Sequence, residues 1–464
     1  MKRPLLIFLL ITSTILLSCA KHNNLTRVNL TFCSKYQRNC VSINDVYSYL
    51  SIIKGIPECK SSQVHIEPIT HASDTVMYLV NYEDGWEILS GDIRMPKVLI
   101  KSDSGSLSRE DILSSPATHL YMDNLSDAIS DIQHSESYRL PDGVTDSWAP
   151  VLRDSIIDTR LIRVLTFIDT TVVSQRLRDH LMETSWGQGS PWNVYAPYTD
   201  STRSSHCYTG CVPVAAAQVL YYLHNKIGYP ETICGSAYCD TYIPASADSI
   251  VLNSADISFS DFSQEHWSEM PLAGNASSGT DKVSALMMYL GYHYSAQYFR
   301  NKTSAYTSYA LNLFPTLFSI SCNSFNVSTN GYSALDSMLS TQVYYQELPV
   351  ILSILRQVPS GWSGHDVVVD GYNHTQNRVR YHYAYYIIPD GGYILPGQDP
   401  VSFDYVDTYY ESTYVAINWG WDGAYNYSNS GSTIWYNLYA NWLVGNRNYS
   451  EKAYAVYNFN QGQL

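Results

Sequence analysis

The pattern of hydrophobic and polar positions begins with a short region that reads as one compact unit. Apolar residues fall at helical spacing in 46–53, whereas 76–80, 86–89 and 95–100 are short apolar or alternating runs. Turn residues at 83–85 and 90–92 separate those runs. This order predicts one helix followed by a small sheet, which is an α+β unit.

The second patterned region contains one long helix and several strands. Pro213 suits a first helical turn, and apolar helix formers continue to Leu223, before Gly228 and Pro230 end the pattern. Far downstream, 349–355 and 365–372 read as strands joined by a turn, and 414–418 reads as another strand. With 464 residues, the chain exceeds what one core usually serves, so we expect two domains.

The strand at 365–372 can be read face by face because side chains alternate along a strand. His365 shares a face with Val367 and Val369, while Asp366 and Asp370 lie on the other face. Asp366 therefore should not orient His365, although it is the next residue. A metal site made of His365, Asp366, Asp370 and His374 is disfavoured for the same reason.

The segment 141–179 carries no clear catalytic motif and mixes charged residues with Pro, Asp and Ser. We interpret it as the connection between the two domains, partly helical near its end. Since it is polar and expected to be exposed, it is also where a protease could cut.

The first residues predict export. Lys2 and Arg3 precede a mostly apolar run at 5–17 that is too short to span a bilayer permanently. The run ends in 16–19, which resembles the lipobox of bacterial lipoproteins and predicts a lipid on Cys19 as the new N-terminus. An ordinary signal peptide with a chance cysteine is the alternative. We expect a chain anchored to the bacterial cell envelope, at the outer membrane, from which the catalytic part could be released.

Composition narrows the partners. Hydrophobic residues at 45% and charged residues at 15% describe a globular chain, and a formal charge of −14 argues against a nucleic-acid partner. The 41 tyrosines indicate either the aromatic-rich surface of an exported protein or a face that binds carbohydrate or peptide.

The cysteines do not define a disulfide framework. Nine cysteines minus Cys19 and Cys211 leave seven, so at least one more thiol is unpaired. Two pairs are close enough in sequence for local bridges, namely Cys33 with Cys40 and Cys234 with Cys239. Neither pair forms a zinc signature, and we expect no metal or other cofactor.

The candidate nucleophile is Cys211, which opens the predicted helix. Unsatisfied N–H groups at a helix N-terminus favour a thiolate over a thiol, and the thiolate is the reactive form. A structural cysteine packed under the helix is the alternative reading. Cys207 is the local competitor, but it precedes the glycine turn at Gly210 and is expected to lie in a loop.

Further residues could complete a hydrolase site. His365 can act as a base, and the Gln188 amide, flanked by two glycines, can join the Cys211 N–H in stabilising an oxyanion. The Asn418 carbonyl can accept the imidazole N–H, and the Trp419 ring can shield that bond from water. A purely structural aromatic turn is the alternative reading at 418–421.

The chain resembles the streptopain family of papain-like bacterial cysteine peptidases. Four segments carry the resemblance in order: 186–193, 210–219, 364–372 and 418–421. The resemblance implies a papain-like fold with a helical part carrying the cysteine and an antiparallel sheet carrying the histidine. It also implies that Cys211 is the nucleophile, His365 the base and later the acid, Gln188 the oxyanion donor, and Asn418 with Trp419 the support of the histidine.

The stretch at 82–99 resembles the inhibitory prodomain of the same family. The expected organisation is a lipoprotein signal peptide at 1–19, a prodomain at 20–140, a linker or activation region at 141–179 and a peptidase domain at 180–464. The prodomain would act as an intramolecular inhibitor.

Three features depart from the family pattern. Asp366 replaces the small residue usual after the histidine, and Asp422 stands where a glycine is common, so both add negative charge near the site. The tyrosine-rich stretch 373–412 is longer than the usual connection and is expected to form an added hairpin at the cleft.

The expected function is that of a lipid-anchored cysteine endopeptidase, made as a zymogen and acting on protein or peptide substrates. Two alternatives stay open: a Cys-His cell-wall amidase or transamidase, and a non-catalytic lipoprotein that binds ligands through its tyrosine-rich face.

Overall fold

A computed structural model describes much of the chain. The described residues are 39–52, 54, 56, 64–114, 116–135, 148, 155–158, 161–230, 233–274, 278–358, 361–387, 398–427, 430–440 and 454–461. The predicted signal peptide, the predicted lipidation site at Cys19 and the Cys33 member of one predicted bridge lie outside these residues.

The N-terminal unit, residues 39–135, contains the predicted helix and small sheet. Its elements are α1 (Ile43–Ile52), β1 (His65–His71), β2 (Asp74–Asn81), β3 (Trp86–Ser90), β4 (Val98–Ser102), α2 (Arg109–Ser114) and α3 (Pro116–Gln133). The strands β1 to β4 pair in order and antiparallel. The hydrophobic pattern of the sequence predicted β2, β3 and β4 but did not indicate β1, α2 or α3.

The helical lobe follows a long loop and carries Cys211. Its elements are α4 (Cys211–Ile227), β7 (Ile233–Cys239), β8 (Ser249–Val251), β9 (Ile257–Phe262), α5 (Gln264–Glu269), α6 (Thr280–His293), β10 (Gln297–Phe299), β11 (Thr303–Ser304), η2 (Thr307–Tyr309) and α7 (Ala310–Phe318). Helix α4 is buried from Val212 to Leu220 without interruption, because it runs through the core of the lobe.

The sheet part carries His365. Its elements are β12 (Ile320–Asn326), α8 (Val327–Asn330), α9 (Tyr332–Leu339), η3 (Ser340–Tyr345), β13 (Val350–Val358), β14 (Gly361–Ile387), β15 (Ser402–Asn418), β16 (Trp435–Asn437) and β17 (Tyr454–Gln461). The predicted α+β fold, with a helical part for the cysteine and an antiparallel sheet for the histidine, is confirmed.

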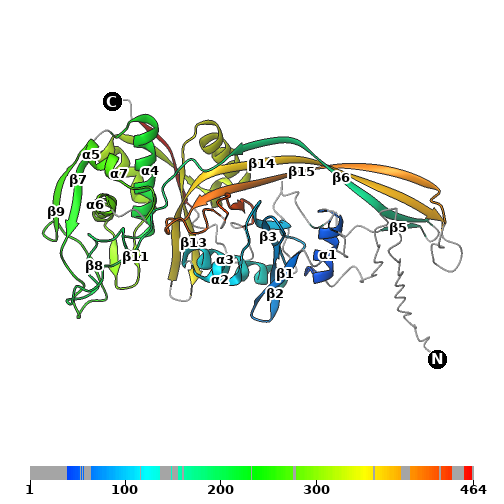
Figure 1. Cartoon of the computed structure of the whole chain (residues 1–464), viewed down its shortest axis with the longest axis horizontal. Coiled ribbons are helices and arrows are strands. Elements are labelled where there is room, and N and C mark those ends of the chain that lie inside the picture. The colour runs from blue at the N-terminus through cyan, green and yellow to red at the C-terminus, as the bar shows by residue number, and fades with distance from the viewer. Residues whose placement is uncertain are drawn as a thin grey trace.

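One antiparallel sheet joins the N-terminal unit to the catalytic part. Its strand order is β1-β2-β3-β4-β16-β15-β14-β13-β17-β12. The junction is short, since β16 meets β4 where Trp435 lies opposite Lys101 and Tyr436 opposite Ile100. Figure 1 shows the helical lobe at one end of the molecule and the N-terminal unit below the middle of the sheet.

A three-stranded arm projects from the sheet at the other end (Figure 1). It consists of β6 (Leu161–Arg178), which pairs with the short β5 (Ser155–Asp158), and the outer halves of β14 and β15. The prediction of a helix near the end of 141–179 is wrong, because this segment is rich in the β-branched residues that favour strands and pairs with β14.

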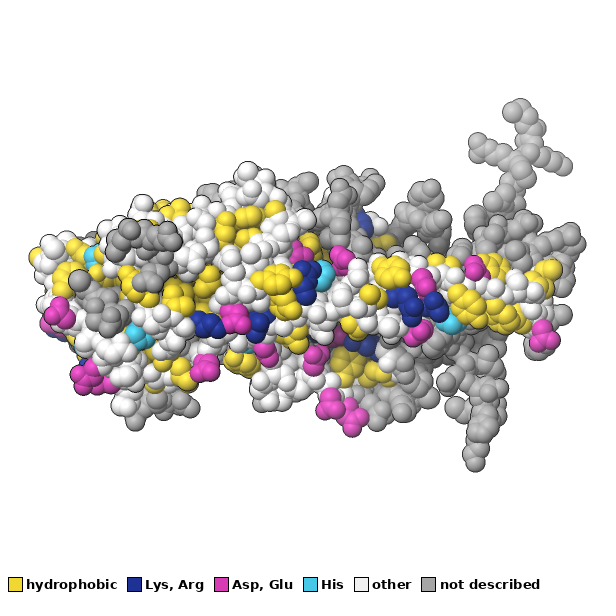
Figure 2. All heavy atoms as spheres, turned by 90° about the horizontal axis from the view of Figure 1, so that it is seen from above, with side chains coloured by type: hydrophobic (Ala, Val, Ile, Leu, Met, Phe, Trp, Pro, Cys, Tyr) yellow, Lys and Arg dark blue, Asp and Glu magenta, His cyan; other side chains and the backbone are white. Residues whose placement is uncertain are grey.

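A hairpin is present within 373–412 as the paired outer halves of β14 and β15, but it projects away from the helical lobe that carries Cys211 (Figure 1), so its predicted place at the cleft is wrong. Several large side chains on it stay exposed, with Phe403 at 63% and Tyr405 at 61%. Figure 2 shows hydrophobic and charged side chains interspersed over this arm.

Among the helices that the structure describes, none combines the length and the apolar character needed to cross a membrane.

Candidate active site

Cys211 is the first residue of α4, as the pattern predicted. The preceding Gly210 has φ 98°, a conformation that favours glycine, and the helix ends at Gly228 in the left-handed region. Burial raises the pKa of Cys211 to about 12, and the nearby charge of Asp366 adds to the effect, although backbone N–H groups oppose it. This environment therefore favours the thiol over the thiolate that the helix N-terminus alone would favour.

Gln188 lies beside the nucleophile segment. Its backbone carbonyl accepts a hydrogen bond of 2.9 Å from Thr209 N, two residues before Cys211, and Thr209 Oγ1 also reaches it at 3.3 Å. The residue is buried. This arrangement positions the loop for the predicted oxyanion role, which stays a prediction.

Asp422, one of the departures from the family pattern, supports the Gln188 loop. Its carboxylate accepts a hydrogen bond from the Trp192 indole, and burial raises its pKa. A Cβ on Gly187 would lie 2.6 Å from Asp422 Oδ1, so a larger residue there would have to displace this carboxylate. Asp422 therefore holds the Gln188 loop in place through contacts with Gly187 and Trp192.

His365 is buried on β14 and points away from Cys211. Its Nε2 lies 2.8 Å from the backbone oxygen of Trp419, and burial lowers its pKa. On the neighbouring strand β13, Ile354 lies opposite His365. Ile354 and Val367 both belong to the hydrophobic core that includes residues of the N-terminal unit, so His365 faces that core. The ring is thus a neutral imidazole that donates from Nε2 to the Trp419 carbonyl.

Asp366 occupies the opposite face of β14, toward α4. Its Oδ2 accepts a hydrogen bond of 2.6 Å from Thr307 Oγ1, and its side chain also bonds to Ser353. The Asp366 backbone is close enough to Cys211 to lower the pKa of that thiol, whereas the Asp366 carboxylate raises it. Burial raises the pKa of Asp366 to about 6.

The predicted alternation of His365 and Asp366 is therefore present, with the acid on the nucleophile's face. Between Cys211 and His365, both of which the structure describes, there is no hydrogen bond. The two predicted members of the catalytic pair lie on opposite sides of one strand.

Asn418 lies at the end of β15, opposite Val368 and hence on the face of α4. Its amide pairs with that of Gln218, with Nδ2 to Oε1 at 3.0 Å and Nε2 to Oδ1 at 3.2 Å. Nδ2 also donates to Thr184 O at 2.7 Å. In this arrangement Asn418 bonds to α4 rather than to His365, so its orienting role stays a prediction.

The sequence motifs did not indicate a role for Gln218. The signal was present, because a glutamine that is fully buried in an apolar helix, two turns after Cys211, needs polar partners. It finds them in Asn418 and Thr184, whose Oγ1 donates to Gln218 Oε1 at 2.9 Å.

Trp419 links the histidine to the N-terminal unit. Its indole Nε1 donates to Tyr436 Oη at 3.0 Å, and its ring packs against Tyr121 of α3, with ring centroids 5.3 Å apart. The side chain is fully buried. Its predicted shielding of an Asn418–His365 bond has no counterpart here, since that bond is not formed.

The other cysteines lie apart from this site. Cys207 is buried in a loop, where burial raises its pKa to about 11. Cys234 and Cys239 belong to one strand, β7, so five extended residues separate them by about 16 Å, too far for a bridge. The predicted bridge between Cys33 and Cys40 is not tested, because Cys33 lies outside the described residues. Within the described ranges, no cluster of His, Cys, Asp or Glu could hold a metal ion.

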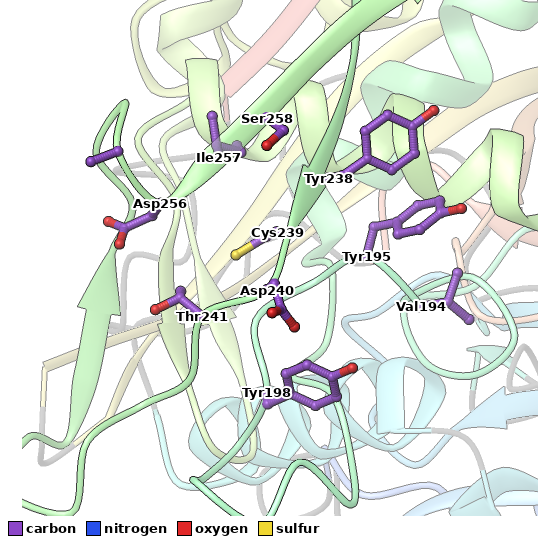
Figure 3. A pocket seen from close by; sticks show the side chains of 11 residues that line it. Val194, Tyr195, Tyr198, Tyr238, Cys239, Asp240, Thr241, Asp256, Ile257 and Ser258 are labelled. Carbon is purple, nitrogen blue, oxygen red and sulfur yellow. The ribbon is translucent and has the colours of Figure 1, made fainter.

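A pocket of about 590 Å³ lies in the helical lobe, away from Cys211. Figure 3 shows three tyrosines in its wall, Tyr195, Tyr198 and Tyr238, with Asp240 and Asp256 nearby. None of the predicted site residues lines it.

Comparisons with known proteins agree with the fold. A fragment of a prointerpain A mutant from Prevotella intermedia has a similar structure, with a TM-score of 0.51 and 16% identity over 85% of this chain and 98% of that chain. Active wild-type interpain A from Prevotella intermedia aligns with a TM-score of 0.38 and 17% identity, over 61% of this chain and 95% of that chain. No curated protein shows a significant sequence match.

The sequence model of the peptidase C10 family matches residues 186–429, which is more than half of the 464 residues. That span holds Gln188, Cys211, His365, Asn418 and Trp419. The chain therefore belongs to the peptidase C10 family and is a cysteine peptidase.

Proposed function

We propose that this chain is the precursor of a cysteine endopeptidase and that its N-terminal unit keeps it inactive. The observation that carries the proposal is the placement of Cys211 and His365 on opposite faces of β14. The histidine is held by the carbonyl of Trp419, and α3 of the N-terminal unit packs against the Trp419 ring. A nucleophile without its base is what an inactive precursor requires.

The reaction needs His365 to reach the face that Cys211 occupies. There the imidazole would take the thiol proton, and the Cys211 sulfur would attack the carbonyl carbon of a peptide bond. The Gln188 amide and the Cys211 N–H would stabilise the negative oxygen. His365 would then give the proton to the leaving amine, and water would release the acyl group from the sulfur. Asn418 already lies on the required face.

Replacement of Cys211 by alanine tests this function. After processing by an added protease, the wild-type chain should cleave casein and react with a thiol-directed irreversible inhibitor. Cys211→Ala should lose cleavage by at least about 10³-fold and lose the label. The matched control is Cys207→Ala, four residues earlier, which should keep both. Cleavage retained by Cys211→Ala would refute the assignment.

We also propose that the precursor is exported and anchored through a lipid on Cys19. The support is the sequence alone, with a basic start, an apolar run and the lipobox-like ending. Cells fed a radiolabelled fatty acid should label the wild-type chain, whereas Cys19→Ser should stay unlabelled. Label on the Cys19→Ser chain would contradict the anchor.

A further inference from the structure

Strand β6 precedes the segment that matches the peptidase family, yet it pairs along its whole length with the strand that carries His365. Its ladder with β14 has sixteen residue pairs, from Leu161 opposite Ile387 to Arg178 opposite Tyr372. Each pair that is broken leaves backbone groups to be satisfied by water, and an edge strand that is removed leaves its neighbour open to other chains. Loss of β6 would uncover the outer half of β14.

Side chains of β6 also belong to the core of the arm. Ile168 is buried against Tyr381 and Val379, within a small hydrophobic cluster that also holds Tyr383. Without β6 these aromatic residues of β14 would lose one wall of their packing. The arm thus depends on β6 for its stability.

The end of β6 nearest the site is fastened to the catalytic part. Arg178 forms an ion pair with Glu347 at 3.1 Å, and its guanidinium lies over the Tyr344 ring. Arg176 donates to Ser340 Oγ at 3.3 Å, and Gln175 donates to Asn373 Oδ1 at 3.2 Å.

The residues directly after β6 are anchored by a buried ion pair. His180 Nδ1 lies 2.8 Å from Asp370 Oδ1, and its Nε2 lies 3.1 Å from Asn426 O. The imidazole is 4% exposed and the carboxylate fully buried. Burial disfavours the charged imidazole, but Asp370 outweighs it and raises the pKa of His180.

The backbone after His180 also bonds to Asp370. Leu181 N donates to Asp370 O at 2.9 Å, and Met182 N donates to Asp370 Oδ2 at 3.0 Å. Asp370 lies five residues after His365 on β14. The anchor therefore ties the chain after β6 to the strand of the catalytic histidine.

We propose that β6 and this anchor stay with the catalytic domain when the precursor is processed, so that the mature enzyme keeps the three-stranded arm. The inference rests on the proposed zymogen function. A protease must hold several residues of its substrate in extended, unpaired form, and within 161–182 this requires stripping the ladder and the anchor. The cut that separates the inhibitory unit therefore falls on the N-terminal side of residue 161.

Two measurements test the proposal. In the first, the self-processed wild-type enzyme is analysed by intact mass and N-terminal sequencing. A mature chain that starts at or before residue 161 supports the proposal. A chain that starts between residues 162 and 186 overturns it.

The second measurement does not need the chain's own activity. The full-length Cys211→Ala precursor is digested briefly with trypsin, which cuts after arginine and lysine, and the fragment that contains residue 211 is identified by mass. A fragment that begins at or before Leu161 supports the proposal, and a fragment that begins at Val164, Leu177 or Asp179 overturns it. If the wild type never processes itself, that result counts against the proposed function, while the tryptic fragment still decides this inference.

The anchor is tested by His180→Ala in the same precursor. Loss of the buried pair should speed tryptic cleavage after Arg176 and Arg178 by at least about tenfold. The control is His119→Ala, since His119 is half-exposed and pairs with Asp123 one turn away on α3. An unchanged cleavage rate in His180→Ala would contradict the anchoring role.

Discussion

His365 donates a hydrogen bond of 2.8 Å from Nε2 to the backbone carbonyl of Trp419. A carbonyl only accepts, so this bond fixes the tautomer of the ring and holds it on the face of β14 that looks away from Cys211. The indole of Trp419 is packed by Tyr121 of α3. One buried tryptophan therefore stands between the N-terminal unit and the position of the base.

Replacement of Tyr121 by alanine should speed conversion of the precursor. The change removes edge-on contacts of the Tyr121 ring with both Trp419 and Tyr436, with centroids 5.3 Å apart in each case. Aromatic pairs of this kind contribute about 1 kcal/mol each, so the inactive arrangement should be destabilised by about 1–2 kcal/mol and processing should accelerate about five- to thirtyfold. Gel electrophoresis of a time course measures the rate.

The control for that change is Tyr47→Ala, which truncates a tyrosine that is 38% exposed on α1. It should leave the rate unchanged. Slower processing in Tyr121→Ala, with the chain still folded by circular dichroism, would show that α3 assists conversion instead of restraining it.

The amide pair between Gln218 and Asn418 should stabilise the contact of α4 with the sheet. Gln218→Leu keeps a similar volume but leaves the amide of Asn418 and the hydroxyl of Thr184 with fewer buried partners. We expect the free energy of unfolding to fall by about 2–3 kcal/mol, measured by urea denaturation. Gln376→Leu, on the exposed arm, should change it by less than about 0.5 kcal/mol. Equal losses in the two variants would argue against a special role for the pair.

Local pattern was enough to predict the parts of the site that depend on nearby residues. The helix after Cys211 follows from Pro213 and the apolar run to Leu223, and the opposite facing of His365 and Asp366 follows from strand alternation. Alternation alone does not tell which of the two faces α4 covers. That depends on packing between segments about 150 residues apart, so the sequence could not reveal that Asp366 lies beside Cys211.

Long-range pairing also explains the other differences. β6 was predicted as a connection, partly helical, because its partner β14 is about 200 residues away in sequence. The joining of the N-terminal sheet to β16 depends on a contact of the same kind. The expected thiolate at Cys211 did not allow for burial, which outweighs the helix N-terminus and raises the thiol pKa.

Gly210 should be needed for the position of Cys211. Its φ of 98° disfavours any other residue, and a Cβ there would lie 3.0 Å from Thr303 Cγ2. Gly210→Ala should lower both the thermal stability and the peptidase activity of the processed enzyme, with about 1–3 kcal/mol lost in stability. The matched control is Gly431→Ala, where φ is 88° and no atom lies within 4 Å of a Cβ. A loss of activity as large in Gly431→Ala would show that backbone strain alone, and not the site, is responsible.

Asp366 should make the precursor less stable as the pH rises. Burial raises its folded-state pKa from 3.8 to about 6, so the folded chain prefers the protonated acid. The stability that this preference gives the folded chain is fully present below pH 4 and is lost as the pH rises through 6. The free energy of unfolding is therefore about 3 kcal/mol lower at pH 7.5. Asp366→Asn should therefore stabilise the precursor by about 2–3 kcal/mol at pH 7.5 and by much less at pH 4, measured by urea denaturation.

The control for Asp366 is Asp407→Asn, because the sign of its effect is opposite. Asp407 is bonded by Arg380 through two hydrogen bonds of 2.7 and 2.8 Å, and this partner lowers its pKa. The stabilisation that Asp407 gives the folded chain is then present at neutral pH and lost as the pH falls. Asp407→Asn should therefore slightly lower the stability of the precursor at pH 7.5. If Asp366→Asn gave the same change at both pH values, the buried carboxyl would not be titrating in this range. Cys211 in Asp366→Asn should also react faster with iodoacetamide at pH 8, because that variant lacks the negative charge beside the thiol.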